Sequence, residues 1–429
     1  MRVRLAYGER GLEVDLPEGA EVVEPTRVPG LPDEEAALVE SLRRPCFGPP
    51  LATLVRRGQR VVVVHSDLTR PAPNSRMLPP ILAELKGAGV RREDVCLLNA
   101  TGLHRPNTPD ELARMLGDRI LREYRVVNHV ASDASRHVHL GQTPHGTEVW
   151  LDREYVEADV RILTGFVEPH FFAGFSGGAK SVLPGVASEL TVLRNHDAPH
   201  LGSPRATWGV TYGNPVFEDG RAAARLAPPS FVVNVTLNDE RRITGVFSGE
   251  LAASHDAGCE LARRSSMRPV ERPYDVVVTT NSGYPADLNL YQAVKGMSAA
   301  AQVVREGGAI VIAAECREGI GHPHFQEILR MADSPRGLLD VVYRPGFLKV
   351  DQWEAQMLAN VLLRAPVYIF ADGLSPEDAR LAQLEPVVDV GRTVRELAAR
   401  FGPDARIGVL PQGPLTIPYL CEPAATGRR

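Results

Sequence analysis

The sequence predicts an α/β fold with two domains, each built on a mostly parallel sheet that helices cover. Short apolar runs of strand length alternate with stretches of helical periodicity, a pattern typical of such sheets. The chain has 429 residues, which is enough for two domains with complete hydrophobic cores. A proline-containing segment, 264–275, interrupts the alternation and indicates the boundary between the two domains.

The first domain is expected to contain four strands. Continuous apolar runs at 60–67, 94–102 and 158–166 are typical of buried parallel strands, and 123–130 is a further candidate. Residues 77–90 read as a helix that ends at glycine. Strands joined by helices in this way predict a Rossmann-like sheet.

The second domain is expected to follow the same plan. Its strand candidates are the apolar runs 274–281, 307–316 and 365–372. The last candidate strand, 405–413, is expected to return to the first domain. We therefore expect an N-terminal cofactor-binding domain, 1–265, completed by 404–429, and a C-terminal domain, 272–400.

Composition excludes several classes of function. A net charge of -5 provides no basic surface for nucleic acid, and no apolar run is long enough to span a membrane. The five cysteines are scattered and form no CxxC pair, so neither a disulfide framework nor a zinc site is expected. The N-terminal sequence lacks the apolar region of a signal peptide, and we expect a cytoplasmic protein.

Polar and ionisable residues gather where the strands of the first domain end. They are Asp67, Thr69 and Arg70 after the first strand, His104 after the second, and His170, Lys180 and His196 after the fourth. Ligands of open α/β sheets bind at the carboxyl ends of the strands. Three strand ends are therefore expected to direct these groups into one crevice.

The stretch GFVEPHFFAGFSGGAKSVLPG, 165–185, has too many glycines for a stable helix or strand. It is either a long loop or a cofactor cradle. Its spacing is not that of a Walker loop, but Gly177 and Gly178 could present backbone N–H groups to a phosphate. In the second domain, a helix would place Gln292 and Lys295 on one face, where they suit a small carboxylate.

Five motifs in this order resemble the nickel-pincer-nucleotide lactate racemase family. They are SDLTRP (66–71), TGLHRP (101–106), EPHFFAGFSGGAKSVLPG (168–185), NH (195–196) and YQAVKG (291–296). The resemblance runs across nearly the whole chain. Its motifs are specific for the family but not for one substrate, because the family includes racemases and epimerases of several 2-hydroxy acids.

The resemblance implies a pyridinium mononucleotide with two sulfur-bearing arms that hold nickel, placed in the cleft between the domains. Lys180 matches the lysine that attaches to this cofactor covalently, and His196 matches the histidine that completes the coordination of nickel. His104 and His170 match two acid/base histidines. Proteins that synthesise the cofactor are implied as partners.

The remaining site residues follow from the same resemblance. The cofactor-binding residues it implies are Asp67, Leu68, Thr69, Arg70, Ser176, Gly177 and Gly178. The implied substrate-binding residues are Arg70, Tyr291, Gln292, Lys295 and Trp353. Phe171, Phe172 and Tyr291 are expected to exclude water from the reaction.

The implied activity is inversion at C2 of a small, lactate-like 2-hydroxy acid. Hydride moves reversibly to the cofactor, and a 2-keto acid is the intermediate. An epimerase of a longer aldonic or dicarboxylic acid is an alternative on the same scaffold. A non-catalytic carrier of the nickel nucleotide is a second alternative, although storage needs neither His104 nor His170. A nicotinamide dehydrogenase would require a GxGxxG turn, which is missing after the first strand.

Overall fold

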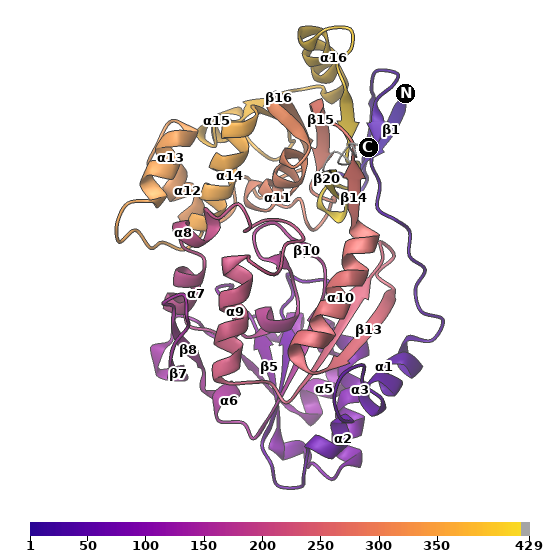
Figure 1. Cartoon of the computed structure of the whole chain (residues 1–429), viewed down its shortest axis with the longest axis vertical. Helices are drawn as coiled ribbons and strands as arrows, with labels where there is room; N and C mark the ends of the chain where they lie inside the picture. The colour runs from indigo at the N-terminus through magenta and orange to yellow at the C-terminus, as the bar shows by residue number, and fades with distance from the viewer. Residues whose placement is uncertain (422–429) are drawn as a thin grey trace, which may run out of the picture. The chain divides into compact units, whose positions relative to one another are not determined.

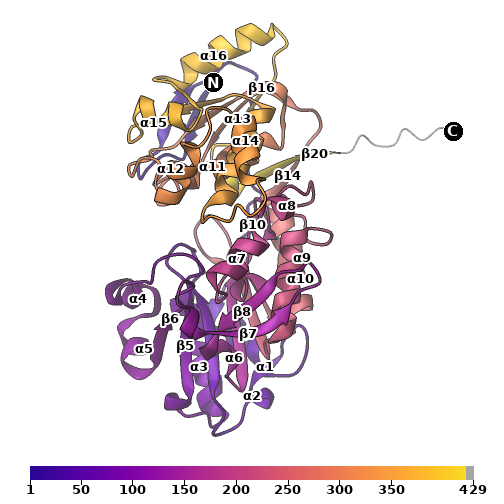
Figure 2. The ribbon, with the colours of Figure 1, turned by 90° about the vertical axis from the view of Figure 1, so that its left-hand side faces the viewer.

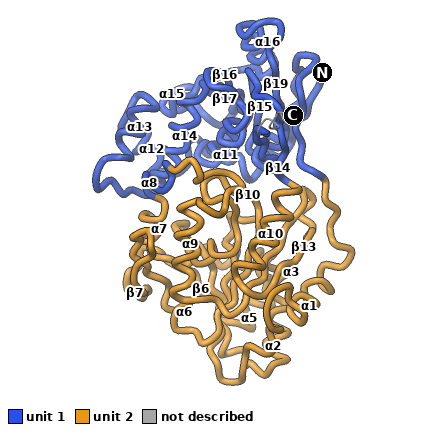
Figure 3. Tube along the Cα trace, in the orientation of Figure 1, with its two compact units in different colours: residues 1–26, 197–202, 266–429 blue, residues 27–196, 203–265 orange. Residues whose placement is uncertain are grey.

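A computed structural model describes residues 1–421. The chain divides into two compact units (Figure 3). Unit 2 contains residues 27–196 and 203–265, and unit 1 contains residues 1–26, 197–202 and 266 onward. The predicted class is confirmed, since both units are α/β and both contain a six-stranded sheet covered by helices.

The sheet of unit 2 has the strand order β13-β12-β9-β4-β5-β6. These strands are β13 (Ile243–Gly249), β12 (Phe231–Leu237), β9 (Val160–Phe166), β4 (Val61–Ser66), β5 (Val95–Ala100) and β6 (Arg125–Asn128). All neighbours are parallel except β13, which runs antiparallel to β12 at one edge. The carboxyl ends of β4, β5 and β9 therefore meet at the same edge of the sheet.

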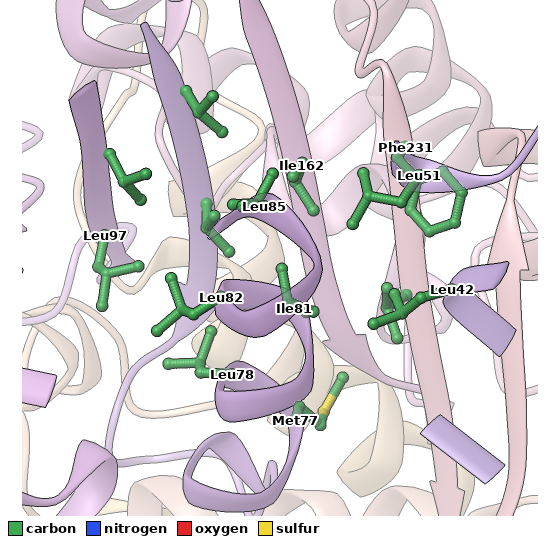
Figure 4. Packing of buried hydrophobic residues seen from close by; sticks show 14 of the residues in the cluster. Leu42, Leu51, Met77, Leu78, Ile81, Leu82, Leu85, Leu97, Ile162 and Phe231 are labelled. Carbon is green, nitrogen blue, oxygen red and sulfur yellow. The ribbon is translucent and has the colours of Figure 1, made fainter. Parts of the chain in front are cut away.

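Helices cover both faces of this sheet (Figure 1). They are α1 (Glu34–Arg43), α2 (Leu51–Leu54), α3 (Asn74–Gly87), α4 (Pro109–Leu116), α5 (Asp118–Glu123), α6 (Arg153–Val156), α7 (Glu189–Asn195), α9 (Pro215–Leu226) and α10 (Leu251–Ser266). Alternate residues of β4 face opposite cores, because successive side chains of a strand point to opposite sides. Val61 and Val63 belong to the core that also contains the apolar face of α3, and Val62 and Val64 belong to the core on the other face. Figure 4 shows the first of these cores, with Leu78 and Ile81 of α3 beside Ile162 of β9.

The sheet of unit 1 has the order β18-β17-β16-β15-β19-β3, and all paired neighbours are parallel. Its strands are β18 (Glu385–Pro386), β17 (Val367–Phe370), β16 (Val304–Ala313), β15 (Tyr274–Thr280), β19 (Ile407–Val409) and β3 (Glu21–Val22). Its helices are α8 (Ala198–Leu201), α11 (Leu290–Ala301), α12 (Pro323–Leu329), α13 (Pro335–Val342), α14 (Gln352–Arg364), α15 (Pro376–Leu381) and α16 (Val390–Phe401). α16 covers one face, and α11 and α14 lie on the other (Figures 1 and 2).

Both ends of the chain differ from the sequence-based prediction. Residues 1–26, expected in the first domain (1–265), belong to unit 1. β19 lies between β15 and β3 in the unit-1 sheet, and β20 (Ile417–Leu420) pairs with β14 (Met267–Val270). The expected return of 405–413 to the first domain is therefore wrong, and residues 404–421 do not complete that domain. A three-residue strand carries too little pattern to reveal which sheet it joins. The rest of the predicted segment, 422–429, lies outside the described residues.

No helix within residues 1–421 is long and apolar enough to cross a membrane. Helices such as α4 and α16 bury one face, whereas α11 and α14 are buried along most of their length. Buried polar side chains are unusual in the interior of such a fold, and several histidines are among them.

His65 on β4 and His255 on α10 are buried in unit 2. Burial lowers the pKa of His65 to about 4 and that of His255 to about 4. The unfolded chain, with a histidine pKa near 6.5, binds protons below that pH while the folded chain does not. The free energy of unfolding is therefore expected to keep its full value above pH 6.5. It should fall as the pH drops from 6.5 to 4, by at most about 3 kcal/mol per histidine.

Urea unfolding of the wild type and of His65→Asn across this pH range checks the expectation. The asparagine amide can replace Nδ1, which lies 3.1 Å from the Ser66 carbonyl oxygen, but it does not titrate. His65→Asn should thus lose part of the pH dependence below pH 6.5. Equal pH slopes for the two proteins would contradict a depressed pKa at His65.

Candidate active site

Residues 165–185 form a hydrogen-bonded loop at the carboxyl edge of the unit-2 sheet. After β9, the chain makes a two-stranded antiparallel ribbon of β10 (Pro169–His170) and β11 (Gly174–Phe175), followed by the 3₁₀ helix Gly178–Ser181. The Ser176 hydroxyl donates to the Phe166 carbonyl at 2.8 Å and ties the ribbon to the end of β9. We call residues 165–185 the glycine loop.

Close packing explains two of the glycines in the glycine loop. Gly174 has a φ of 75°, and a Cβ there would lie 2.0 Å from the carbonyl oxygen of Val210. Gly178 has a φ of 55°, and a Cβ there would lie 2.5 Å from the ring of His255. The N–H of Gly178 donates to Oδ1 of Asn234 at 3.1 Å, so this donor is engaged within the protein.

Phe172 brings three of the predicted residues together. Its ring centroid lies 4.6 Å from that of His170 and 5.0 Å from that of His196, and Lys180 Nζ lies 5.6 Å from the same centroid. Lys180 Nζ is also 3.4 Å from His170 Nε2. The aromatic ring thus lies against three polar groups, and His170, Phe172 and His196 are buried.

The hydrogen bonding of His170 indicates which nitrogen faces the site. Its Nδ1 accepts the backbone N–H of Ala173 at 3.3 Å. A neutral imidazole that accepts at Nδ1 carries its proton on Nε2. Nε2 is the atom that faces Lys180. A proton exchanged with a bound molecule would therefore pass through Nε2.

His196 caps the C-terminus of α7 with its backbone and is 5% exposed. It lines one small cavity together with Lys180, Phe217 and His255. His200, four residues later, belongs to unit 1, and its Nδ1 contacts Oδ1 of Asp197 at 2.7 Å. Within residues 1–421, no group of three or more His, Cys, Asp or Glu side chains is arranged to hold a metal ion.

Asp67 and His104 form a hydrogen-bonded pair at the ends of the adjacent parallel strands β4 and β5. His104 Nδ1 lies 2.8 Å from Asp67 Oδ2, and the Thr69 hydroxyl donates to Asp67 Oδ1 at 2.8 Å. Burial alone would raise the pKa of Asp67, but the hydrogen bonds from His104 and Thr69 and the charge of Arg70 hold it below its ordinary value. The carboxylate is therefore ionised at neutral pH and orients the imidazole so that Nε2 points away from it.

The structure gives Asp67 a contact that the sequence did not predict. The resemblance assigned Asp67 only to the cofactor, whereas its carboxylate hydrogen-bonds a predicted acid/base histidine. The sequence did contain one indication of this contact, because both residues follow strands that are parallel neighbours. Near them, Leu68 is exposed, and a guanidinium nitrogen of Arg70 lies 3.9 Å from the Glu168 carboxylate.

Unit 1 contains the second group of predicted residues. Asn289 caps α11, and Lys295 Nζ donates to Gln292 Oε1 at 2.5 Å. The predicted pairing of Gln292 and Lys295 on one face of a helix is present. Trp353, at the start of α14, donates from Nε1 to the Tyr291 hydroxyl at 2.9 Å.

Three further residues of unit 1 surround this group and were missed by sequence reasoning. The His322 ring stacks on Tyr291 with centroids 3.8 Å apart, and His322 Nδ1 lies 3.4 Å from Asp351 Oδ2. Burial raises the pKa of Glu354 to about 8, against the opposing charge of Lys295. A glutamate within a helix is usually exposed, so the sequence carried no signal for a buried carboxyl group there.

Comparison with known proteins places the chain in a family. Residues 7–209 match the lactate racemase N-terminal domain, and residues 270–417 match the lactate racemase C-terminal domain. The chain is 37% identical to the lactate racemase of Lactiplantibacillus plantarum over 89% of this chain and 90% of the relative. It is 33% identical to the lactate racemase of Thermoanaerobacterium thermosaccharolyticum over 96% of this chain and 97% of the relative.

Solved structures agree. The lactate racemase apoprotein of Thermoanaerobacterium thermosaccharolyticum superposes with a TM-score of 0.90 at 32% identity, covering 98% of this chain and all of that one. A Thermotoga maritima protein shares the fold, with a TM-score of 0.69 at 20% identity over 90% of this chain and 97% of that one. Fold and relatives thus define a two-domain α/β isomerase. The chain belongs to the lactate racemase family, which confirms the resemblance drawn from its motifs.

Proposed function

We propose that this protein is a racemase that interconverts the two configurations at C2 of lactate or a close 2-hydroxy acid. The observation that carries the proposal is the pair of histidines, His104 and His170, each positioned by a hydrogen bond at Nδ1 and each presenting Nε2. Inversion of a carbinol centre requires one acid/base group for each configuration of the substrate. Membership of the family supports lactate as the substrate.

The residues of unit 2 fit the nickel-pincer nucleotide. Lys180 and His196 line one cavity, so one molecule could contact both. The protein offers no cluster of three metal ligands within residues 1–421, and a nickel ion at His196 would therefore need most of its ligands from the nucleotide. Lys180 would form the covalent attachment, and His196 would bind the nickel.

When bound, the cofactor supplies a reversible acceptor for the C2 hydrogen of the substrate as hydride. The chain's own residues handle the proton of the substrate hydroxyl. His104 Nε2 would accept this proton for one configuration, and Asp67 would stabilise the resulting imidazolium through Nδ1. His170 Nε2 would serve the other configuration. To accept a proton there, the ring must take the tautomer with its proton on Nδ1, which breaks the contact with the Ala173 N–H. Phe171 and Phe172 are buried beside His170 and would exclude water.

The polar residues of unit 1 would bind the substrate carboxylate. Lys295 supplies a positive charge and Gln292 a hydrogen-bonding amide, and their side chains already contact each other. Tyr291 and Trp353 are held by their mutual hydrogen bond and would form a rigid wall. Arg70 in unit 2 would provide a further positive charge for carboxylate or phosphate.

The proposal is tested by loading the protein with cofactor, through coexpression with the biosynthetic proteins, and incubating it with L-lactate. Chiral chromatography should show D-lactate approaching an equal mixture. In deuterium oxide, both enantiomers should retain the original hydrogen at C2. Deuterium at C2 would contradict hydride transfer. Inversion of longer aldonic or dicarboxylic acids but not lactate would support the alternative substrates, and no inversion at all would favour a carrier.

His196→Ala is expected to lose nickel and yet remain folded. The backbone N–H of His196, and not its ring, completes the last turn of α7 by donating to the Val192 carbonyl. Elemental analysis of cofactor-loaded protein measures the metal, and thermal unfolding monitors the fold. His200→Ala is the matched control and should keep its nickel. Loss of nickel in His200→Ala, with full retention in His196→Ala, would transfer the role to His200.

Lys295→Ala is expected to raise KM by about 10- to 100-fold, the value of one charge-assisted hydrogen bond. Adduct mass and nickel content should not change. The neighbouring Glu354 is mostly protonated at neutral pH, so removal of Lys295 leaves no unpaired buried anion. Steady-state kinetics with lactate provides the measurement, and Lys349→Ala, which removes a lysine paired with Glu327, is the control. Loss of the cofactor itself in Lys295→Ala would disprove the separation of roles.

A further inference from the structure

His255 lies beneath the glycine loop, outside every motif that the sequence analysis identified. It projects from α10 and is 1% exposed. Its Nε2 atom is 2.8 Å from the carbonyl oxygen of Ser176. This contact joins a helix to the loop four residues before Lys180, across 79 positions of sequence.

The ring of His255 also occupies the space that a side chain at position 178 would need. A Cβ on Gly178 would lie 2.5 Å from Cγ and 2.7 Å from Cδ2 of the ring. The side-chain oxygen of Asn234 accepts the N–H of the same Gly178. Two buried polar side chains, His255 and Asn234, therefore hold the segment 176–178. The hydrogen bond to the Ser176 carbonyl and the close packing against Gly178 both depend on the imidazole of His255.

The same ring reaches the site. His255 lines the cavity that Lys180 and His196 also line, and Phe217 stacks on it with centroids 5.9 Å apart and an interplanar angle of 21°. A displacement of the ring would therefore move the loop and the wall of the cavity together.

The chemistry of the contact is specific. A carbonyl oxygen can only accept, so Nε2 of His255 must carry a proton. Burial lowers the pKa of His255 to about 4, and the ring is neutral under the conditions of the assays above. Sγ of Cys259 lies beside the ring, 3.6 Å from Nε2 and 3.9 Å from Nδ1. His255 thus provides the glycine loop with one hydrogen-bond donor, at a fixed distance from the backbone of α10.

We propose that His255 is a positioning residue, whose Nε2 donor to the Ser176 carbonyl fixes the glycine loop and thereby the location of Lys180 Nζ. This role rests on the proposed covalent attachment at Lys180, but the geometry it controls exists without the cofactor.

The chain contains only four lysines, Lys86, Lys180, Lys295 and Lys349, which makes the position of Lys180 measurable. Apoprotein is treated with an acetylating ester, and peptide mass spectrometry follows each lysine. His255→Gln can place an amide N–H at the position of Nε2, whereas His255→Asn reaches only as far as Nδ1, and His255→Leu has no donor. The other three lysines are internal standards.

The labelling rate of Lys180 should change by about three- to tenfold in His255→Leu and His255→Asn, which is the effect expected from the loss of one hydrogen bond. In His255→Gln the rate should return toward that of the wild type. The other lysines should react at wild-type rates. Should His255→Leu lose its fold, the comparison of Gln with Asn decides the question. Equal Lys180 rates in His255→Gln, His255→Asn and wild type would overturn the proposal.

Adduct occupancy in cofactor-loaded protein separates this proposal from the proposed function. If His255 positions Lys180, His255→Asn should carry less adduct than His255→Gln. If wild type carried no adduct while the labelling rates still depended on the donor at position 255, covalent attachment would fail and the positioning role would stand.

Discussion

His104→Ala and His170→Ala should each stop racemisation in both directions. General acid–base catalysis contributes about 10²- to 10⁴-fold, and a loss in this range is expected for either substitution. Each conversion begins with proton transfer to one histidine and ends with proton transfer from the other, because the reverse reaction must follow the same path. An enzyme with one of these groups can therefore complete neither direction.

The same two variants should retain the adduct at Lys180 and the nickel at His196. Polarimetry starting from each pure enantiomer measures the rates. His139→Ala is a suitable control, because it removes an exposed histidine that contacts Glu148 away from the site. Wild-type rates from both enantiomers in either His104→Ala or His170→Ala would refute a mechanism with two bases.

The positions of these histidines were predictable for a simple geometric reason. β4, β5 and β9 are parallel neighbours, so residues that follow them must share one edge of the sheet. The sequence reveals such strands as continuous apolar runs, and it reveals the glycine loop by its composition. The helical spacing of Gln292 and Lys295 was equally visible, because it depends only on local periodicity.

What could not be predicted depends on contacts between distant parts of the chain. The pairing of Asp67 with His104 requires the side-chain conformations at two strand ends, and His255 is a single polar residue within an amphipathic helix. β19 is only three residues long, and its position between β15 and β3 results from pairing across most of the chain. Short strands and isolated buried polar residues carry no periodic signal.

Lys180→Ala should abolish covalent attachment of the cofactor and with it all racemase activity. Lys180 is the only lysine of the glycine loop, and its Nζ lies beside His170 and Phe172 in a site that also contains His196. The backbone hydrogen bonds of the loop, such as Lys180 N to Gly177 O at 3.1 Å, do not need the side chain. The variant should therefore fold as the wild type does.

Intact mass spectrometry of cofactor-loaded protein should show an added mass on the wild type that Lys180→Ala lacks. Lys180→Arg should also lack it, because arginine keeps the positive charge but cannot form the covalent attachment proposed for the lysine amine, and this variant separates charge from covalent chemistry. Lys349→Ala, at a lysine paired with Glu327, should carry the full adduct. With only four lysines in the chain, peptide mapping assigns the modified position unambiguously. An adduct that persists in Lys180→Ala on Lys86, Lys295 or Lys349 would show that the glycine loop binds the cofactor without being its point of attachment.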